Sequence, residues 1–140
     1  MKTTAEVTRE WFAQVWDPDA TESQLQERVS TLFNAEPTGV AGRTLTRDQI
    51  MPVVLMWRKL LPGLRMSVDT LLTEGEIAMA AVTWRWGEHT FPCAVRCRVQ
   101  GGKIVEADNF FDTLVLNEIL GWSCATPTDF WAQAAAFVAE

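Results

Sequence analysis

Tyrosine is absent from the 140 residues, and histidine occurs once, at position 89. Without tyrosine, no reaction that depends on a phenolic hydroxyl group can be assigned to this chain. Basic residues are also few, because 12 lysines and arginines stand against 18 aspartates and glutamates, for a net charge of −6. Nucleic-acid-binding proteins need clustered lysine and arginine, so nucleic acid is not an expected partner.

Long apolar runs are missing too. No segment approaches the roughly 18 consecutive apolar residues of a membrane-spanning helix. Residues 1–10 are charged and polar, unlike a signal peptide, so we expect a cytoplasmic protein without a membrane partner. Nearly half of the residues, 48%, are hydrophobic, and 140 residues suit a single domain with its own core over residues 1–140.

Cysteine is present three times, but its spacing argues against cross-links. Cys93 and Cys97 lie four residues apart in an expected strand, which separates their Cα atoms by roughly 13 Å. That distance is too long for a disulfide. It also weakens a metal site made of His89, Cys93 and Cys97, because metal ligands must converge. We expect buried free thiols, no metal and no cofactor.

The first half of the chain carries helix signals. Three pairs have the spacing of a helix capping box: Thr3 with Glu6, Thr21 with Gln24, and Thr46 with Gln49. Pro52 falls inside the third helix, so either that helix is kinked or its first turn begins near Met51. Residues 34–42, with a proline and two glycines, are expected to form a loop.

The second half alternates between apolar and polar residues, as strands do. Strands are expected at 64–73, 76–86 and 90–100, and a fourth follows the Gly101-Gly102 turn. A short helix up to Gly121 and a helical tail over 126–139 complete the chain. Three helices followed by a four-stranded antiparallel meander indicate the α+β class, with the helices gathered on one face of the sheet.

Asp112 stands where the strand pattern of 101–110 changes to helical spacing. A carboxylate at that point either caps the helix or lies at the rim of an apolar cavity. Caps are the commoner use, because an aspartate at a helix start accepts a hydrogen bond from a free backbone N–H group. The pattern alone leaves both interpretations open.

The segment GKIVEADNFFDT resembles the ending of the SnoaL-like and limonene-epoxide-hydrolase-like families of the nuclear-transport-factor-2-like superfamily. The resemblance implies a cone-shaped, curved antiparallel sheet wrapped around the N-terminal helices. It also implies a homodimer formed through the sheet, and a small apolar molecule bound in an internal cavity. In SnoaL-like cyclases the last aspartate of this segment is an acid/base residue, and Asp112 matches it.

Arg85 matches the arginine of limonene-epoxide hydrolase, which bridges two aspartates. The middle acid of that triad is replaced by Gly87, so epoxide hydrolysis would need Asp108 or Glu88 as a substitute. Arg85 has two interpretations from the residues alone. It is a strand-end arginine that reaches solvent or Glu88, or a cavity arginine paired with Asp112.

Glu36 precedes a proline, as does the general base of ketosteroid-isomerase-like enzymes, although a plain loop turn has the same pattern. The first-helix tyrosine of that family corresponds to Trp11 here, so the resemblance excludes tyrosine-dependent isomerase and scytalone-dehydratase-like mechanisms. Trp11 joins a set of aromatic residues that suit a flat hydrophobic ligand or a plain core equally well: Trp11, Trp57, Trp84, Phe91 and Phe110.

His89 lies in the expected hairpin, where it is either solvated or part of the site. Together with the resemblance, these residues favour a small-molecule enzyme of the SnoaL-like type. It would perform acid/base chemistry, as a cyclase, isomerase or hydrolase, on an apolar substrate, with Asp112 as acid/base and Arg85 orienting it. The alternative is a non-catalytic module of the same fold that binds a hydrophobic ligand or only dimerises.

Overall fold

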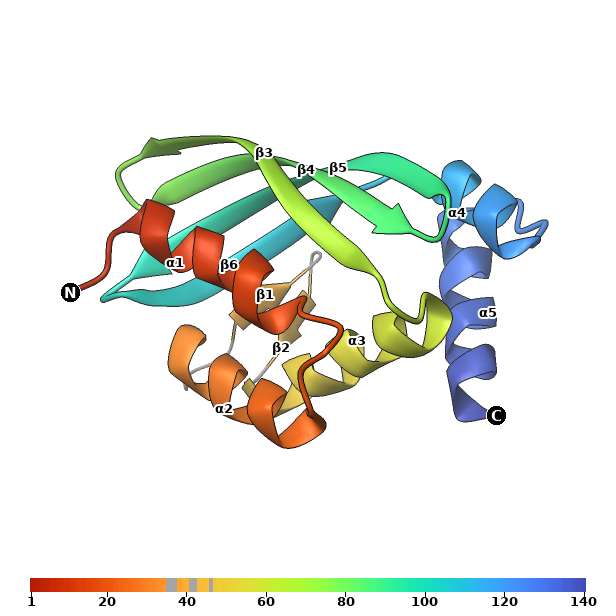
Figure 1. Cartoon of the computed structure of the whole chain (residues 1–140), viewed down its shortest axis with the longest axis horizontal. Coiled ribbons are helices and arrows are strands. Elements are labelled where there is room, and N and C mark those ends of the chain that lie inside the picture. Colours follow the sequence, from red (N-terminus) through yellow and green to blue (C-terminus); the bar gives the residue numbers. More distant parts are fainter. Residues whose placement is uncertain (35–37, 41–42, 46) are drawn as a thin grey trace.

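The structure, a computed structural model, describes residues 1–34, 38–40, 43–45 and 47–140. Helices and strands form two layers, with a long twisted sheet above the N-terminal helices (Figure 1). The observed class is α+β with a curved sheet, as the sequence predicted. No helix in the described ranges is long and apolar enough to cross a membrane.

The N-terminal helices begin where the capping boxes predicted. Helix α1 (Thr4–Glu10) is capped by Thr3, whose hydroxyl accepts from the Glu6 N–H while the Glu6 carboxylate accepts from the Thr3 N–H. Helix α2 (Glu22–Leu32) begins with the same reciprocal arrangement. The chain leaves α1 through a π-helical turn, η1 (Trp11–Val15), which continues the first helical segment.

Helix α3 (Arg47–Leu60) contains Pro52 in its interior. Of the two sequence interpretations, a start near Met51 is therefore wrong, and the helix begins one turn earlier. Its apolar face is buried: Val54 and Trp57 are only 1% and 3% exposed. Thr46, the predicted cap, lies outside the described residues.

Four long antiparallel strands form the predicted meander, with ends within two residues of the predicted ones. They are β3 (Arg65–Glu74), β4 (Ile77–Trp86), β5 (His89–Gln100) and β6 (Lys103–Phe110). The sheet has two further short strands, β1 (Thr38–Val40) and β2 (Arg43–Leu45), in the order β2-β1-β6-β5-β4-β3. The prediction of a plain loop was therefore wrong for residues 38–40, which pair in parallel with β6.

The two faces of the sheet differ in burial. On β4, Ala78, Ala80, Val82 and Trp84 are at most 2% exposed and face the helices, which we call the inner face. The alternate residues face away, and Met79 is 43% exposed there. The outer side of β4 is therefore open within this chain, because its helices pack on one face only.

The C-terminal helices close one end of the sheet. Helix α4 (Thr113–Leu120) ends at Gly121, whose φ of 70° suits glycine, and α5 (Pro127–Ala139) follows. In Figure 1 both lie at the end of the sheet where β4 turns into β5. Phe130 and Ala134 of α5 are fully buried. The apolar face of the tail therefore packs within its own subunit.

Candidate functional site

Asp112 lies between β6 and α4, and it is the N-cap of that helix. One carboxylate oxygen, Oδ1, accepts a hydrogen bond of 2.8 Å from the backbone N–H of Leu114. The side chain is exposed, and its other oxygen makes no hydrogen bond to any described residue. The cap interpretation is thus observed, and one carboxylate oxygen remains open to solvent.

Arg85 does not join Asp112. It occupies an exposed position on β4 and faces away from its neighbours Trp84 and Trp86, because successive strand residues point to opposite faces. Within the described part of the chain, no ion pair or hydrogen bond connects its guanidinium to Asp112. The cavity interpretation of Arg85 is therefore wrong, and the arginine–aspartate arrangement of limonene-epoxide hydrolase is not assembled.

The two acids considered as substitutes are also placed elsewhere. Asp108 accepts a hydrogen bond of 3.1 Å from Arg96 across β5 and β6, on the outer face of the sheet. Glu88 is exposed in the turn between β4 and β5. Glu36 lies outside the described residues, so its predicted role as a second carboxylate stays a prediction.

Five rings form one contiguous group, which we call the aromatic cluster: Trp57, Trp84, Phe91, Phe111 and Trp131. The ring centroids of Trp57 and Trp84 are 5.0 Å apart, and Phe91 lies 5.1 Å from Trp84. Phe111 and Trp131 each lie within 5.7 Å of Trp57. Rings of α3, β4, β5 and α5 thus meet at the end of the sheet that leads to Asp112.

The other predicted binding residues lie outside this cluster. Trp11 packs instead against Trp16 and Phe33 among the N-terminal helices, at centroid distances of 5.6 and 4.8 Å. Phe110 is 56% exposed on the outer face of β6. His89 is exposed and stacks on Trp86, with centroids 6.0 Å apart.

Phe111, Trp131 and Asn109 are the residues that sequence reasoning missed. Ala107 is buried on the inner face, and strict alternation from it predicts Asn109 and Phe111 on that face and Phe110 on the other. This alternation could therefore have placed Phe110 and Phe111 on opposite faces from the sequence alone. Asn109 pairs with buried Val95 on β5 and is half-buried, so it adds a polar side chain to the inner face. Trp131 comes from a distant helix, and no local pattern indicates its partners.

Polar atoms are few inside the core. The indole nitrogen Nε1 of Trp84 is buried and has no hydrogen-bond partner among the described residues. Burial raises the pKa of the Cys93 thiol to about 11, and the Phe110 backbone and the Trp84 indole offset this only in part. Burial likewise raises the pKa of Cys97 to about 12. Both thiols are therefore protonated at neutral pH and are poor nucleophiles.

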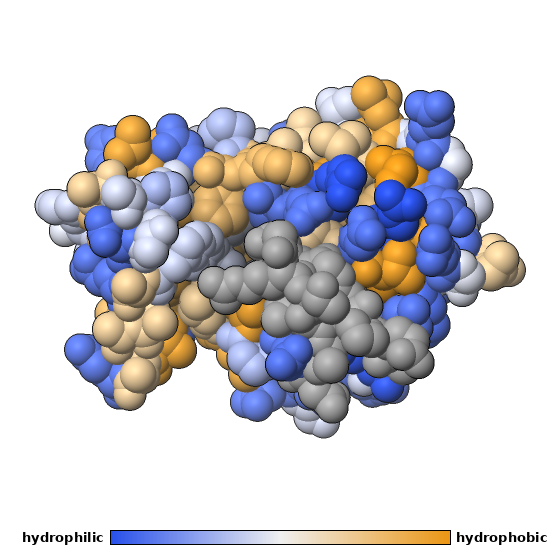
Figure 2. All heavy atoms as spheres, turned by 180° about the vertical axis from the view of Figure 1, so that it is seen from behind, coloured by the Kyte–Doolittle hydropathy of each residue, from blue (hydrophilic) through white to orange (hydrophobic). Residues whose placement is uncertain are grey.

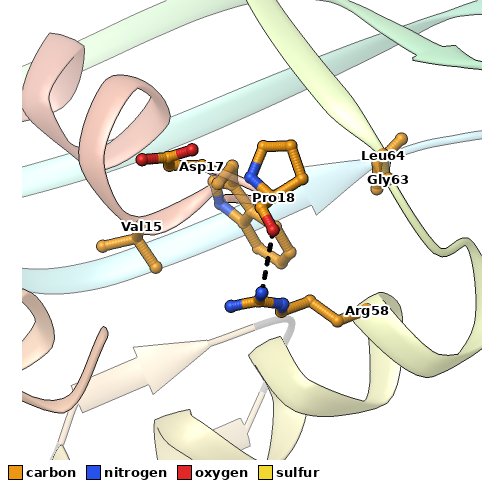
Figure 3. Close-up of a pocket in the computed structure, with 7 residues that line it drawn as sticks. Val15, Asp17, Pro18, Arg58, Gly63 and Leu64 are labelled. Atoms are coloured by element: carbon orange, nitrogen blue, oxygen red, sulfur yellow. Dashed lines mark hydrogen bonds between the residues drawn. The ribbon is translucent and has the colours of Figure 1, made fainter. Parts of the chain in front are cut away.

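Two hollows are lined entirely by described residues. The first, about 20 Å³, lies beside Arg58, which donates hydrogen bonds of 3.0 and 2.8 Å to the carbonyls of Pro18 and Ala20 (Figure 3). It has room for about one water molecule. The second is an open groove of about 250 Å³ between η1 and β3, with Phe12 and Met66 among its lining. Neither hollow includes Asp112 or a residue of the aromatic cluster.

Comparison with solved structures identifies the fold. A SnoaL-like polyketide cyclase from Jannaschia sp. CCS1 superposes with a TM-score of 0.70 at 13% sequence identity, over 89% of this chain and 93% of that one. The fold is that of the SnoaL-like proteins. A ketosteroid-isomerase-like protein from Catenulispora acidiphila in complex with trimethylamine has a TM-score of 0.67 at 20% identity, over 86% of this chain and 96% of that one.

A third neighbour in fold is TerC, co-crystallized with polyporic acid. Its TM-score is 0.67 at 17% identity, over 84% of this chain and 98% of that one. No protein-family model matches the sequence, and no curated protein matches it. At these identities the similarity establishes the SnoaL-like fold and leaves the chemistry to the residues of the site.

Among the described residues, no three His, Cys, Asp or Glu side chains gather as metal ligands. The candidate site is therefore the end of the inner face where the aromatic cluster meets the β6–α4 junction. It combines an apolar wall and one buried indole N–H group, and the exposed carboxylate of Asp112 follows Phe111 in the chain.

Proposed function

We propose that this chain is a small-molecule enzyme of the SnoaL-like type, with Asp112 as its acid/base and a flat apolar substrate held against the aromatic cluster. The cluster offers ring faces and edges to a planar molecule and contains no charged side chain. Rings of this kind bind other aromatic rings in edge-to-face or offset arrangements. The reaction class is proton transfer, as in a cyclase, an isomerase or a hydrolase.

One observation carries the proposal: Phe111 and Asp112 are consecutive residues. The Phe111 ring belongs to the aromatic cluster, and Asp112 follows it directly in the chain as the N-cap of α4. The helix uses only one carboxylate oxygen of Asp112 as a cap. The second oxygen is available to remove a proton from a carbon atom beside a carbonyl group and to return it elsewhere on the substrate.

The fold neighbours agree with this proposal. Several are described as polyketide cyclases, and one was crystallized with polyporic acid. Arg85 has no part in the proposed reaction, because it lies on the other face of the sheet. Glu36 remains a candidate for a second carboxylate.

A second candidate function is ligand binding without chemistry. The observation that favours it is the exposure of Asp112, since general acids and bases are commonly held in partly desolvated sites. In that case the aromatic cluster would hold a hydrophobic ligand, and Asp112 would serve the helix alone.

Deuterium exchange separates the two candidates without knowledge of the natural substrate. 2-Tetralone is a flat bicyclic ketone whose carbon-bound protons next to the carbonyl exchange slowly in D₂O. We expect the protein to accelerate this exchange, and Asp112→Asn to reduce the acceleration by roughly 10²- to 10⁴-fold. Asparagine still caps the helix, so the variant stays folded. Binding of 2-tetralone without accelerated exchange would establish the second candidate instead.

We also propose that the chain forms a homodimer through the outer face of the sheet. That face is not covered by the chain's own helices, and it exposes large apolar side chains, including Leu72, Met79 and Phe110. Arg96 and Arg98 on β5 form ion pairs with Glu106 on β6 on the same face, so paired charges and apolar side chains alternate there. Protein interfaces commonly combine apolar contacts with polar groups that are paired.

A further inference from the structure

Among the described residues, Trp84 carries the one indole N–H group of the aromatic cluster that is buried without a hydrogen-bond partner. The residue is 2% exposed, and Nε1 has no hydrogen-bond partner in the described part of the chain. Its neighbour Trp86 differs, because that indole donates a hydrogen bond of 2.9 Å to the Pro62 carbonyl. Buried polar groups are almost always paired, so an unpaired donor requires an explanation such as a missing ligand.

The surroundings of Trp84 offer little as an acceptor. Its ring is enclosed by Trp57, Phe91 and Phe111, which carry no oxygen atom on their side chains. Cys93 is paired with Val82 and lies diagonally across from Trp84, and its thiol is close enough for the indole N–H group to offset slightly the rise that burial causes in its pKa. A neutral thiol is only a weak acceptor, and Cys93 is neutral at pH 7 because burial raises its pKa to about 11.

The residues around Trp84 also determine which charge the ligand can carry. An indole N–H group only donates, so the ligand must supply an acceptor. The cluster holds no cation, and an anion buried there would lose its hydration without a counter-charge. An uncharged oxygen acceptor meets both conditions, and a ketone carbonyl is the simplest.

We propose that Trp84 is a ligand-positioning residue: its indole N–H group donates a hydrogen bond to an uncharged carbonyl oxygen of the ligand bound at the aromatic cluster. This inference rests on the proposed function and names the ligand class for that site. Trp84 then discriminates between ligands of equal shape that do and do not carry a hydrogen-bond acceptor. The same hydrogen bond orients the carbonyl group of the ligand, and with it the carbon-bound protons next to that group.

The cluster is accessible from one side. Trp57, Trp84 and Phe91 are at most 4% exposed, whereas Phe111 and Trp131 are half-buried. Solvent therefore reaches the cluster beside these two rings. Trp131 is the one member that comes from α5.

Two probes of similar shape test the proposal: 2-tetralone, which has a carbonyl group, and tetralin, which does not. The dissociation constants of both are measured by titration for the wild type, Trp84→Phe and Trp86→Phe. We expect Trp84→Phe to shift the ratio of the two constants by roughly tenfold in favour of tetralin, because it removes the donor. Trp86→Phe, which removes an indole already paired with Pro62, should leave the ratio unchanged.

Nuclear magnetic resonance of the wild type provides a measurement that needs no stable variant. The indole proton of Trp84, identified by its absence in Trp84→Phe, should move downfield on addition of 2-tetralone and not on addition of tetralin. Equal shifts and an unchanged ratio of constants would overturn the role of Trp84 and leave the apolar site intact. Failure of both probes to perturb any ring of the cluster would overturn the proposed function together with this inference.

Discussion

At the residue scale, the Asp112 side chain has two uses: it caps α4, and it is the proposed acid/base. Its Oδ1 atom accepts the Leu114 N–H and so satisfies a backbone group that the helix itself leaves unpaired. Its other oxygen faces solvent beside a cluster of rings. The two uses are compatible because a carboxylate has two oxygen atoms, and they can be separated by substitution.

The cap predicts a difference between two substitutions of Asp112. Asp112→Ala should lower the free energy of unfolding by about 0.5–2 kcal/mol, whereas Asp112→Asn should leave it nearly unchanged, since both Asp and Asn are good caps. Urea denaturation measures both. Equal losses for the two variants would show that the charge of the carboxylate, and not its cap hydrogen bond, stabilises the fold.

Arg85→Met should leave stability within about 0.5 kcal/mol of the wild type, because the side chain is exposed and contacts no carboxylate among the described residues. Combined with Asp112→Asn, its effect on the free energy of unfolding should be additive. A coupling energy well above experimental error in this double-mutant cycle would mean that the two side chains interact after all.

The three cysteines should differ in reactivity in the folded protein. Burial raises the pKa values of Cys93 and Cys97 to about 11 and 12, so almost no thiolate is present at pH 8. Cys124 is half-buried, and its thiol lies 3.0 Å from the Gln133 side chain near the surface. We expect a thiol reagent at pH 8 to label Cys124 first. All three should react in urea, and rapid native labelling of Cys93 would contradict its position in the core.

Helix α5 contributes to the candidate site at the element scale. It brings Trp131 to the aromatic cluster and buries Phe130 against Trp122, with ring centroids 5.5 Å apart. Lys59 of α3 donates a hydrogen bond of 2.8 Å to the Val138 carbonyl near the end of α5. The helix thus closes the site from the side of α3 and α4.

Two phenylalanines of α5 provide a matched pair. Phe130 is fully buried, so Phe130→Ala should cost about 3–5 kcal/mol, while Phe137 is 39% exposed and Phe137→Ala should cost clearly less. Urea denaturation followed by tryptophan fluorescence gives both values. Similar small losses would indicate that α5 detaches without consequence for the rest of the fold.

At the scale of the whole molecule, the distribution of apolar side chains over the surface bears on which face can form an interface. On the face shown in Figure 2, hydrophobic residues reach the surface in areas separated by hydrophilic ones. The exposed apolar side chains of the outer sheet face are contributed by three strands, with Leu72 opposite Met79 and Phe110 opposite Ala94 in the strand register. Register, and not local sequence, brings them onto one face.

The proposed homodimer predicts the effect of a charge on that face. Phe110→Lys should convert the dimer to a folded monomer in size-exclusion chromatography with light scattering, because it buries an unpaired charge at the interface. Leu114→Lys is the control, since Leu114 is 68% exposed on α4 and lies off the sheet. A wild type that is monomeric at high concentration, or dissociation by both variants alike, would contradict an interface on the sheet.

The sequence by itself determined the elements whose signals are local. Capping boxes predicted the starts of α1 and α2, period-two alternation predicted β3 to β6, and Gly121 marked the end of α4. For Trp11 and Trp57 the sequence left a core position and a ligand site open, and both residues are buried. These features depend on hydrogen bonds and burial within a few residues, so a short stretch of sequence contains the information.

Only the tertiary structure decided what depends on distant partners. The three-residue strand β1 exists because it pairs with β6, and three residues are too few to show a period. Arg85 faces solvent because the helices cover the other side of β4, and both sides of that strand look equally apolar in the sequence. The Trp131 ring contacts Trp57, and the Trp84 indole lacks a hydrogen-bond partner. Both features follow from the convergence of α3, β4 and α5, which no spacing along the chain encodes.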